Sequence, residues 1–176
     1  MKKIFYILIL FFGSINISMA EVNRIVAGNK DAKITIIAYE SLTCSHCADF
    51  HKDVYPQLKK DYIDTGLAKI EFRHFPLDIA AFNASKISQC KSNESLRILN
   101  SLYSNQQAWV RGNTVEEINN NLKKFIENQG FEINFEKCIN NKEIEDFVLN
   151  DRIEGVKKFK VNATPTIIIN DEKFEK

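Results

Sequence analysis

The sequence predicts an α/β domain in which a strand–helix–strand unit is separated from a final strand by a long helical block. Three patterns predict this class. A β-branched segment at 33–39 and a second strand-like segment at 68–75 flank a helical pattern that begins at Cys44. The segment 77–159 contains no proline and shows repeated helical spacing. The segment 161–170 then returns to strand composition.

The composition is that of one folded globular chain. Of the 176 residues, 44% are hydrophobic and 27% are charged, and 24 Lys and Arg nearly balance 23 Asp and Glu. These values exclude a disordered tail, a collagen-like repeat and a basic nucleic-acid-binding arm. The length favours one domain, or one domain that carries an insertion. With so small a net charge, no electrostatic field directs the protein to nucleic acid or to anionic lipid.

Residues 1–20 predict a signal peptide. Lys2 and Lys3 form a short positive region, residues 4–12 are an unbroken apolar run, and residues 18–20 (Ser-Met-Ala) supply a small-x-small cleavage pattern. The apolar run is too short to span a bilayer comfortably, which favours a cleaved signal over an uncleaved anchor, the alternative that stays open. We therefore expect no stable membrane insertion after signal removal. Outside the cytosol, cysteines are oxidised unless something keeps them reduced.

The first strands and the helix between them form a βαβ unit. Residues 33–39 are nearly all apolar, as in a strand that is covered on both faces. A helix follows from Cys44 to about Asp61, and the strand at 68–75 ends at Pro76. Two strands joined through a helix are expected to be parallel, with a right-handed connection.

The clearest helix of the helical block starts at Thr114. Thr114 and Glu117 form a capping box, and Gly130 ends the helix. Apolar residues at helical spacing mark an earlier helix near residues 96–103 and a later one near residues 144–148. We interpret these apolar stripes as helix-packing core.

The segment Cys44-Ser45-His46-Cys47 carries the chemistry. Because Cys44 opens a helix, unpaired backbone N–H groups and the helix dipole stabilise its thiolate, and His46 adds a second donor or cation. A stabilised thiolate stabilises the reduced pair, which makes the Cys44–Cys47 disulfide an oxidant. We predict that the exposed Cys44 forms the mixed disulfide with a substrate and that the shielded Cys47 resolves it.

Two other interpretations of this motif stay open. One is an ordinary structural disulfide between Cys44 and Cys47. The other is a metal site, in which His51 extends the pattern to C-x2-C-x3-H and His46 is a fourth ligand. Because adjacent helical residues do not face one point, His46 and Cys47 are awkward co-ligands. We predict no bound metal and no other cofactor.

Three separated motifs together resemble the DsbA-like thiol:disulfide interchange proteins of the thioredoxin superfamily. The motifs are SLTCSHCA at 41–48, FRHFPLD at 72–78 and ATPT at 163–166. The resemblance implies a periplasmic protein with a thioredoxin fold that a helical insertion splits in two. The implied parts are 21–76 for the first part of the fold, 77–160 for the helical insertion and 161–176 for the second part.

The resemblance also assigns roles to the third motif. It implies that the peptide bond before Pro165 is cis and that Pro165 lies beside the cysteine pair. The base rate for proline alone would favour a trans bond. The backbone of Thr164 is then placed to pair with an extended substrate segment, as an edge strand does. The helical insertion is implied to cap the active-site end of the sheet.

The sequence departs from the family pattern in three places. Ser45 stands where proline is usual, which leaves the redox potential open. Ala38 stands where relatives often carry a buried acid, and Glu40 lies two residues later on the same strand face, so its role as proton acceptor is open. The family fold also continues into a hairpin partner and a C-terminal helix, whereas this chain ends at Lys176. We therefore expect a truncated fold, in which the final strand lacks its partner and one sheet face is open.

Cys90 and Cys138 lie 48 positions apart, both in the helical block. Relatives resemble this chain in having such a pair, and in an oxidising compartment a structural disulfide is its simplest fate. Two buried free thiols are the alternative. His51 and His74 are interpreted as surface or packing histidines.

Three functions compete at this stage. The favoured one is a periplasmic dithiol oxidase that donates disulfides to reduced exported proteins and is recycled by a membrane-bound, quinone-linked oxidase. The second is an isomerase or reductase of the same fold, with which Thr164 is compatible, although residues 21–32 are too few for a dimerisation domain. The third is a non-enzymatic metal-binding or copper-delivery module that uses Cys44, Cys47 and His46.

Overall fold

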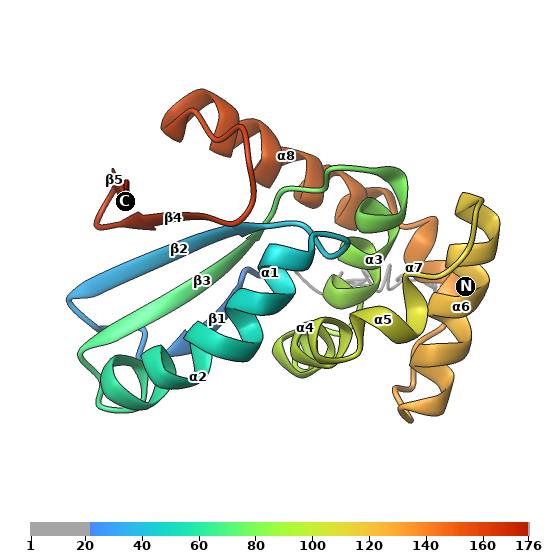
Figure 1. Ribbon diagram of the computed structural model, residues 1–176, viewed down its shortest axis with the longest axis horizontal. Helices are drawn as coiled ribbons and strands as arrows, with labels where there is room; N and C mark the ends of the chain where they lie inside the picture. The colour runs from blue at the N-terminus through green and yellow to red at the C-terminus, as the bar shows by residue number, and fades with distance from the viewer. Residues whose placement is uncertain (1–21, 176) are drawn as a thin grey trace, which may run out of the picture.

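The computed structural model describes residues 22–175, and the predicted signal peptide at residues 1–20 lies outside this range. The described strands form one mixed sheet with the order β1-β3-β2-β4-β5 (Figure 1). Their bounds are β1 Ile25–Gly28, β2 Ile34–Glu40, β3 Ala68–His74, β4 Thr166–Ile169 and β5 Glu172–Lys173. The central strands β2 and β3 are parallel, whereas β1, β4 and β5 each pair antiparallel with their neighbours.

The helix after β2 is one continuous helical segment with two π-helical stretches. It comprises α1 (Ser45–Asp49), η1 (Phe50–Val54), α2 (Tyr55–Leu58) and η2 (Lys59–Ile63). Pro56 lies in α2, and because proline has no N–H it cannot continue a regular hydrogen-bond ladder. The adjacent π-helical turns are consistent with that interruption.

The remaining helices follow β3. They are α3 (Ile79–Gln89), α4 (Ser95–Ser104), α5 (Gln106–Trp109), α6 (Val115–Asn128), α7 (Phe135–Ile139) and α8 (Lys142–Phe159). Thr114 caps α6 by accepting a hydrogen bond from the Glu117 backbone N–H, and the Glu117 carboxylate accepts one from the Asn113 N–H. The sequence pattern thus predicts this N-terminus correctly, although Val115 is exposed and lies outside the core.

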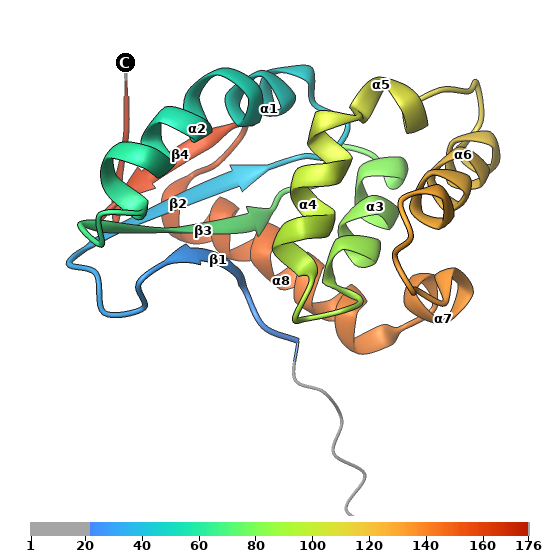
Figure 2. The same ribbon diagram turned by 90° about the horizontal axis from the view of Figure 1, so that it is seen from below.

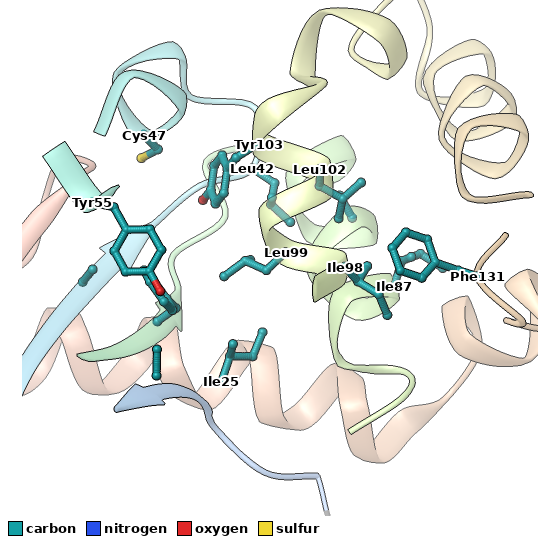
Figure 3. Close-up of a cluster of buried hydrophobic side chains, with 14 of the residues drawn as sticks. Ile25, Leu42, Cys47, Tyr55, Ile87, Ile98, Leu99, Leu102, Tyr103 and Phe131 are labelled. Carbon is teal, nitrogen blue, oxygen red and sulfur yellow. The ribbon is translucent and has the colours of Figure 1, made fainter. Parts of the chain in front are cut away.

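Two helical layers cover the sheet. Helices α1 and α2 lie on one face and α8 crosses the other, while α3 to α7 gather beyond one end of the strands (Figures 1 and 2). The larger core joins the α1 face to the helical block and contains Cys47 together with Leu42, Tyr55 and Tyr103 (Figure 3). The smaller core lies on the other face of β2 and includes Tyr39. None of the helices within residues 22–175 combines the length and the hydrophobicity that a membrane-spanning helix requires.

The structure corrects the expectation for the end of the sheet. The final strand β4 does have a second partner, because Ile168 pairs with Lys173 and Ile169 with Glu172. Asn170 and Asp171 form the hairpin turn, with φ of 48° and 67°, as a two-residue turn of this kind requires. The prediction of an unpartnered final strand was therefore wrong for the described residues.

Candidate active site

Cys44 is the N-cap residue of α1, and Cys47 lies one turn further into the helix. Cys44 has an extended backbone with φ −76° and ψ 122°, and its side chain is half-buried. Cys47 is fully buried, and the two cysteines are not bonded to each other. One sulfur of the pair is therefore accessible from solvent and the other is enclosed by the core.

The loop before β4 reaches the accessible sulfur. The Thr164–Pro165 peptide bond is cis, and the Cys44 Sγ donates a hydrogen bond to the Thr164 carbonyl oxygen at 3.4 Å. The next residue, Thr166, is held by a hydrogen bond from its hydroxyl to the Ala163 carbonyl at 2.7 Å. Residues 120 positions apart in the chain thus form one surface around Cys44.

Two side chains from the helical block hold the active-site turn in place. The Gln106 amide donates to the carbonyl oxygens of Leu42 (2.9 Å) and Cys44 (3.0 Å). Asp78 caps α3 and also accepts a hydrogen bond from the Thr43 hydroxyl at 2.6 Å. The sequence analysis did not assign a role to either residue. Asp78 lies within one of the quoted motifs, but no sequence signal marks Gln106.

The surroundings of Cys47 disfavour its thiolate. Burial raises the pKa of the Cys47 thiol well above its ordinary value, and the nearby Glu40 carboxylate raises this pKa further. The Ser41 backbone and the Thr164 hydroxyl lower it only in part. The Thr164 Oγ1 is buried and makes no other hydrogen bond within the described residues. Cys47 is therefore a neutral thiol whenever the pair is reduced near neutral pH.

Glu40 lies on the same face of β2 as Ala38, which packs in one core with Cys47, and it contacts His51 of η1. Both side chains are buried, with exposed fractions of 3% and 5%, and the Glu40 Oε2 lies 2.8 Å from the His51 Nε2. Burial raises the pKa of Glu40, while His51 and the Tyr103 hydroxyl lower it. The His51 ring stacks on Tyr103, with 4.0 Å between ring centroids. His51 is thus a packing residue and not a surface residue, and it also forms a buried polar pair with Glu40.

The two residues between the cysteines point away from this core. Ser45 and His46 are exposed, and His46 lies 3.8 Å from Asp49 on the surface of α1. The His46 side chain is 82% exposed, whereas Cys47 is buried. Within residues 22–175, no three His, Cys, Asp or Glu side chains converge on a point that could hold a metal ion.

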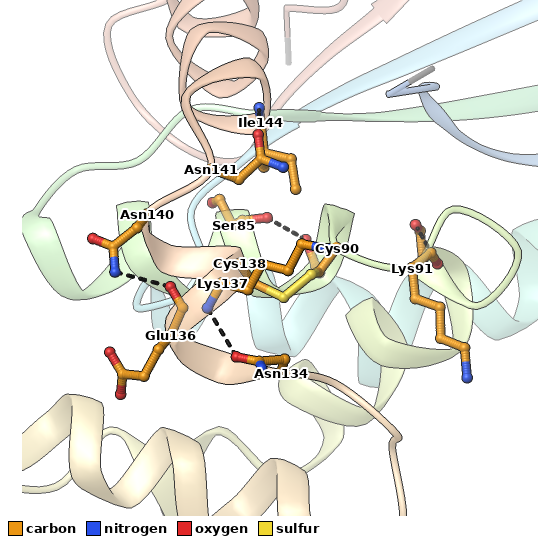
Figure 4. The surroundings of a disulfide bond; sticks show 12 residues. Ser85, Cys90, Lys91, Asn134, Glu136, Lys137, Cys138, Asn140, Asn141 and Ile144 are labelled. Carbon is orange, nitrogen blue, oxygen red and sulfur yellow. Dashed lines mark hydrogen bonds between the residues drawn. A yellow bond between two sulfur atoms is a disulfide. The ribbon is translucent and has the colours of Figure 1, made fainter. Parts of the chain in front are cut away.

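Cys90 and Cys138 are joined by a disulfide in the helical block. Cys90 is the C-cap residue of α3 and Cys138 lies in α7, with 5.6 Å between their Cα atoms (Figure 4). The side chain of Asn134 caps α7 beside them by accepting a hydrogen bond from the Lys137 N–H. This disulfide fastens two helices of the block and is separate from the Cys44–Cys47 pair.

Comparisons with known proteins agree with this architecture. The family model for thioredoxin matches residues 20–176, so the chain belongs to the thioredoxin family. The crystal structure of alpha-DsbA1 from Wolbachia pipientis superposes with a TM-score of 0.75 at 31% identity, over 90% of this chain and 82% of that one. Within its superfamily the chain is accordingly a DsbA-like protein, and the fold predicted from its sequence is confirmed.

Curated relatives are longer than this chain. A protein-disulfide oxidoreductase of Rickettsia bellii is 28% identical over 155 residues, which is 87% of this chain and 59% of the relative. Disulfide bond formation protein D of Bacillus subtilis is 26% identical over 157 residues, 84% of this chain and 68% of that protein. The chain therefore spans less than two thirds of the Rickettsia relative that it matches.

Proposed function

We propose that the protein is a thiol:disulfide oxidoreductase that donates the Cys44–Cys47 disulfide to reduced exported proteins. The observation that carries this proposal is the asymmetry of the pair. Cys44 is accessible beside the Thr164 carbonyl, whereas Cys47 is fully buried. Only one of the two sulfurs can meet a protein substrate. The names of the relatives, a protein-disulfide oxidoreductase and a disulfide bond formation protein, support the same reaction class.

The proposed reaction transfers two electrons from substrate to enzyme. A substrate thiolate attacks the Cys44 Sγ, and the Cys44–Cys47 bond breaks with its electron pair on the Cys47 Sγ. Because the Cys47 thiolate is disfavoured in its buried position, it takes up a proton as it forms. A second substrate thiolate then attacks the substrate sulfur of the mixed disulfide and releases Cys44 as a thiolate. The substrate gains a disulfide and the enzyme is left reduced.

The Thr164 backbone is the proposed contact for the substrate chain. Its carbonyl already accepts a hydrogen bond from Cys44, and the cis-Pro165 bond that follows holds the loop against the cysteine. An extended substrate segment that pairs with this backbone would lie alongside the Cys44 sulfur. The export signal at residues 1–20, the periplasmic location and reoxidation by a membrane-bound, quinone-linked oxidase belong to the same proposal.

Oxidative refolding of a reduced protein tests this function. Oxidised enzyme is added in stoichiometric amount to reduced, unfolded ribonuclease, and substrate thiols are counted after an acid quench. We expect two substrate thiols to be lost for each enzyme molecule reduced. Cys44→Ser should abolish the transfer, and Cys47→Ser should retain the reactive Cys44 and accumulate a mixed disulfide with thiol-activated peptides.

The equilibrium with glutathione separates an oxidase from a reductase. A reduction potential less negative than about −200 mV is expected for a donor, and a value near about −270 mV, as for thioredoxin, would contradict the proposal. Efficient reshuffling of scrambled ribonuclease without net oxidation would identify an isomerase instead. Stoichiometric copper binding without thiol oxidation of the substrate would favour the metal-binding function.

A further inference from the structure

We propose that His51 is the proton-relay residue of the resolving cysteine and connects the buried Glu40 carboxylate to a cavity that opens beside α1. The inference rests on the proposed function, because it concerns the proton that Cys47 exchanges in the thiol–disulfide step. It follows from three features of the structure: a buried carboxylate on the face of β2 that packs in the same core as Cys47, a histidine hydrogen-bonded to that carboxylate, and a cavity that reaches this histidine.

The surroundings of the Glu40 carboxylate favour a role in proton transfer over a purely structural role. Its Oε2 lies 2.8 Å from the His51 Nε2, and the Tyr103 hydroxyl is close enough to lower the pKa of Glu40, whereas its Oε1 is buried and has no well-directed hydrogen bond within the described residues. A buried carboxylate oxygen without a well-directed hydrogen bond is costly in a packed interior. Protonation would lower this cost. Glu40 lies on the same face of β2 as Ala38, which belongs to the core cluster that contains Cys47, and the Glu40 carboxylate acts electrostatically on Cys47. Glu40 can therefore give a proton to the departing Cys47 sulfur and take it back when Cys47 becomes the nucleophile.

Glu40 cannot itself exchange that proton with solvent, because its side chain is only 3% exposed. His51 supplies the next step. Its Nε2 faces Glu40, which leaves Nδ1 as the ring atom for a second proton transfer. A cavity of about 320 Å³ begins at His51 and Tyr103. Exposed residues of α1 form its outer wall, so the cavity opens toward solvent next to Cys44.

The other ionisable groups around His51 do not offer an equal route. Tyr103 stacks on the ring from α4 and its hydroxyl also interacts with Glu40, while Tyr55 of α2 lies 5.5 Å away between ring centroids. Burial raises the pKa of both phenols, so neither releases a proton near neutral pH. Asp49 and Lys52 line the outer part of the cavity. Both are exposed, and neither forms a hydrogen bond or ion pair with Glu40 within the described residues.

Reaction of the reduced protein with the disulfide reagent DTNB (5,5′-dithiobis-2-nitrobenzoate) separates the two cysteines in one measurement. The Cys44 thiolate attacks the reagent disulfide, forms a mixed disulfide and releases a first thionitrobenzoate. Cys47 then gives its proton to Glu40, attacks the Cys44 sulfur and releases a second thionitrobenzoate. One reagent disulfide is reduced and two enzyme thiols become a disulfide. The two releases appear as successive phases of absorbance at 412 nm.

His51→Gln keeps a hydrogen-bond donor for Glu40 but removes the ring that can pass a proton on. We expect its second phase to be at least about tenfold slower than that of the wild type and to lose the wild-type dependence on pH, because proton transfer by a positioned side chain contributes about 10²- to 10⁴-fold. The first phase should stay within about twofold. The matched control is His74→Gln. His74 is also a buried histidine and lies on β3, and its substitution should leave both phases unchanged.

Chemical rescue distinguishes a relay from a packing role. His51→Ala enlarges the cavity, and added imidazole should restore the second phase in that variant but not in a Glu40→Gln variant. A second phase in His51→Gln with the wild-type rate and pH profile would overturn the inference. So would a slow phase that imidazole does not restore in His51→Ala while circular dichroism shows a native fold. If the wild type oxidises ribonuclease and the His51 variants equal it in the second DTNB phase, this inference alone is overturned. If the wild type does not oxidise ribonuclease, the proposed function is overturned.

Discussion

At the scale of single residues, the interior of this protein holds ionisable groups whose neutral forms are favoured. Cys47, Glu40 and His74 are almost completely buried, and burial shifts the pKa of each toward its uncharged state. For Cys47 and Glu40 the consequence in the proposed mechanism is a proton that moves during the redox step. For His74, whose ring is buried and whose cation is further disfavoured by the charge of Arg24, the consequence is a stability that depends on pH.

The pH dependence of unfolding should identify His74. Burial lowers the pKa of His74 to about 3, and the charge of Arg24 acts in the same direction. The unfolded chain, with an ordinary histidine pKa of about 6.5, binds this proton first as the pH falls, so stability is lost on acidification below about 6.5. Between pH 7 and pH 5 the loss from this group is about 2 kcal/mol.

Urea unfolding of wild type and His74→Gln at both pH values measures that loss as a difference, in which the titration of the carboxylates cancels. We expect the variant to lose about 2 kcal/mol less than the wild type on acidification. Equal losses in the two proteins would show that His74 does not stay neutral in the folded state.

At the scale of secondary-structure elements, the contact of α8 with the sheet depends on a glycine. A Cβ at Gly155 would lie 2.8 Å from the Tyr39 Cε1, and Tyr39 is fully buried. The Tyr39 ring also packs against Phe75 and Phe159, and Arg73 donates a hydrogen bond to its hydroxyl. The ring therefore has no room to move away, and α8 can approach β2 this closely only with glycine at position 155.

Gly155→Ala should lower stability even though alanine is the better helix former. Helix propensity alone favours alanine by about 1 kcal/mol, whereas overpacking against a fixed ring costs about 1–3 kcal/mol. We expect a net decrease in the free energy of unfolding, measured by urea titration. Asn150→Ala, on an exposed position of the same helix, is the control and should be neutral or slightly stabilising. A more stable Gly155→Ala protein would show that the helix and sheet can separate at little cost.

At the scale of the whole molecule, the helical block and the sheet share one core and one active site. The larger hydrophobic cluster runs from β1 to α7, and Gln106 reaches from the block to the backbone of the active-site turn. The Cys90–Cys138 disulfide fastens α3 to α7 within this block. Its position predicts a contribution to stability with little direct effect on the chemistry of Cys44.

The double variant Cys90→Ala/Cys138→Ala tests this separation of roles. A disulfide that closes a loop of 48 residues contributes about 4 kcal/mol through the entropy of the unfolded chain. We expect the free energy of unfolding of the variant, with its Cys44–Cys47 pair oxidised, to be lower than that of the oxidised wild type by about that amount in guanidinium titrations. The rate at which Cys44 reacts with DTNB should be unchanged. A large change in that rate with little loss of stability would instead indicate a coupling between the two cysteine pairs.

The α/β class, the order of the main elements and the cysteine motif could be predicted before folding was considered, because each follows from local patterns, and the resemblance of three motifs to one family added the thioredoxin fold. A β-branched run predicts β2, the segment that ends at Pro76 predicts β3, and the Thr114–Glu117 spacing predicts the start of α6. The short β1 and β5 were missed, since strands of four and two residues have too few positions to show a period. The contact of Gln106 with the active-site turn and the contact of Glu40 with His51 could not be predicted. Each joins residues that meet only when β2, the helix that follows it and the helical block have packed together. Local spacing in the sequence identifies the candidate reactive residues. Tertiary packing decides which of them lose contact with water, and burial then favours their neutral forms.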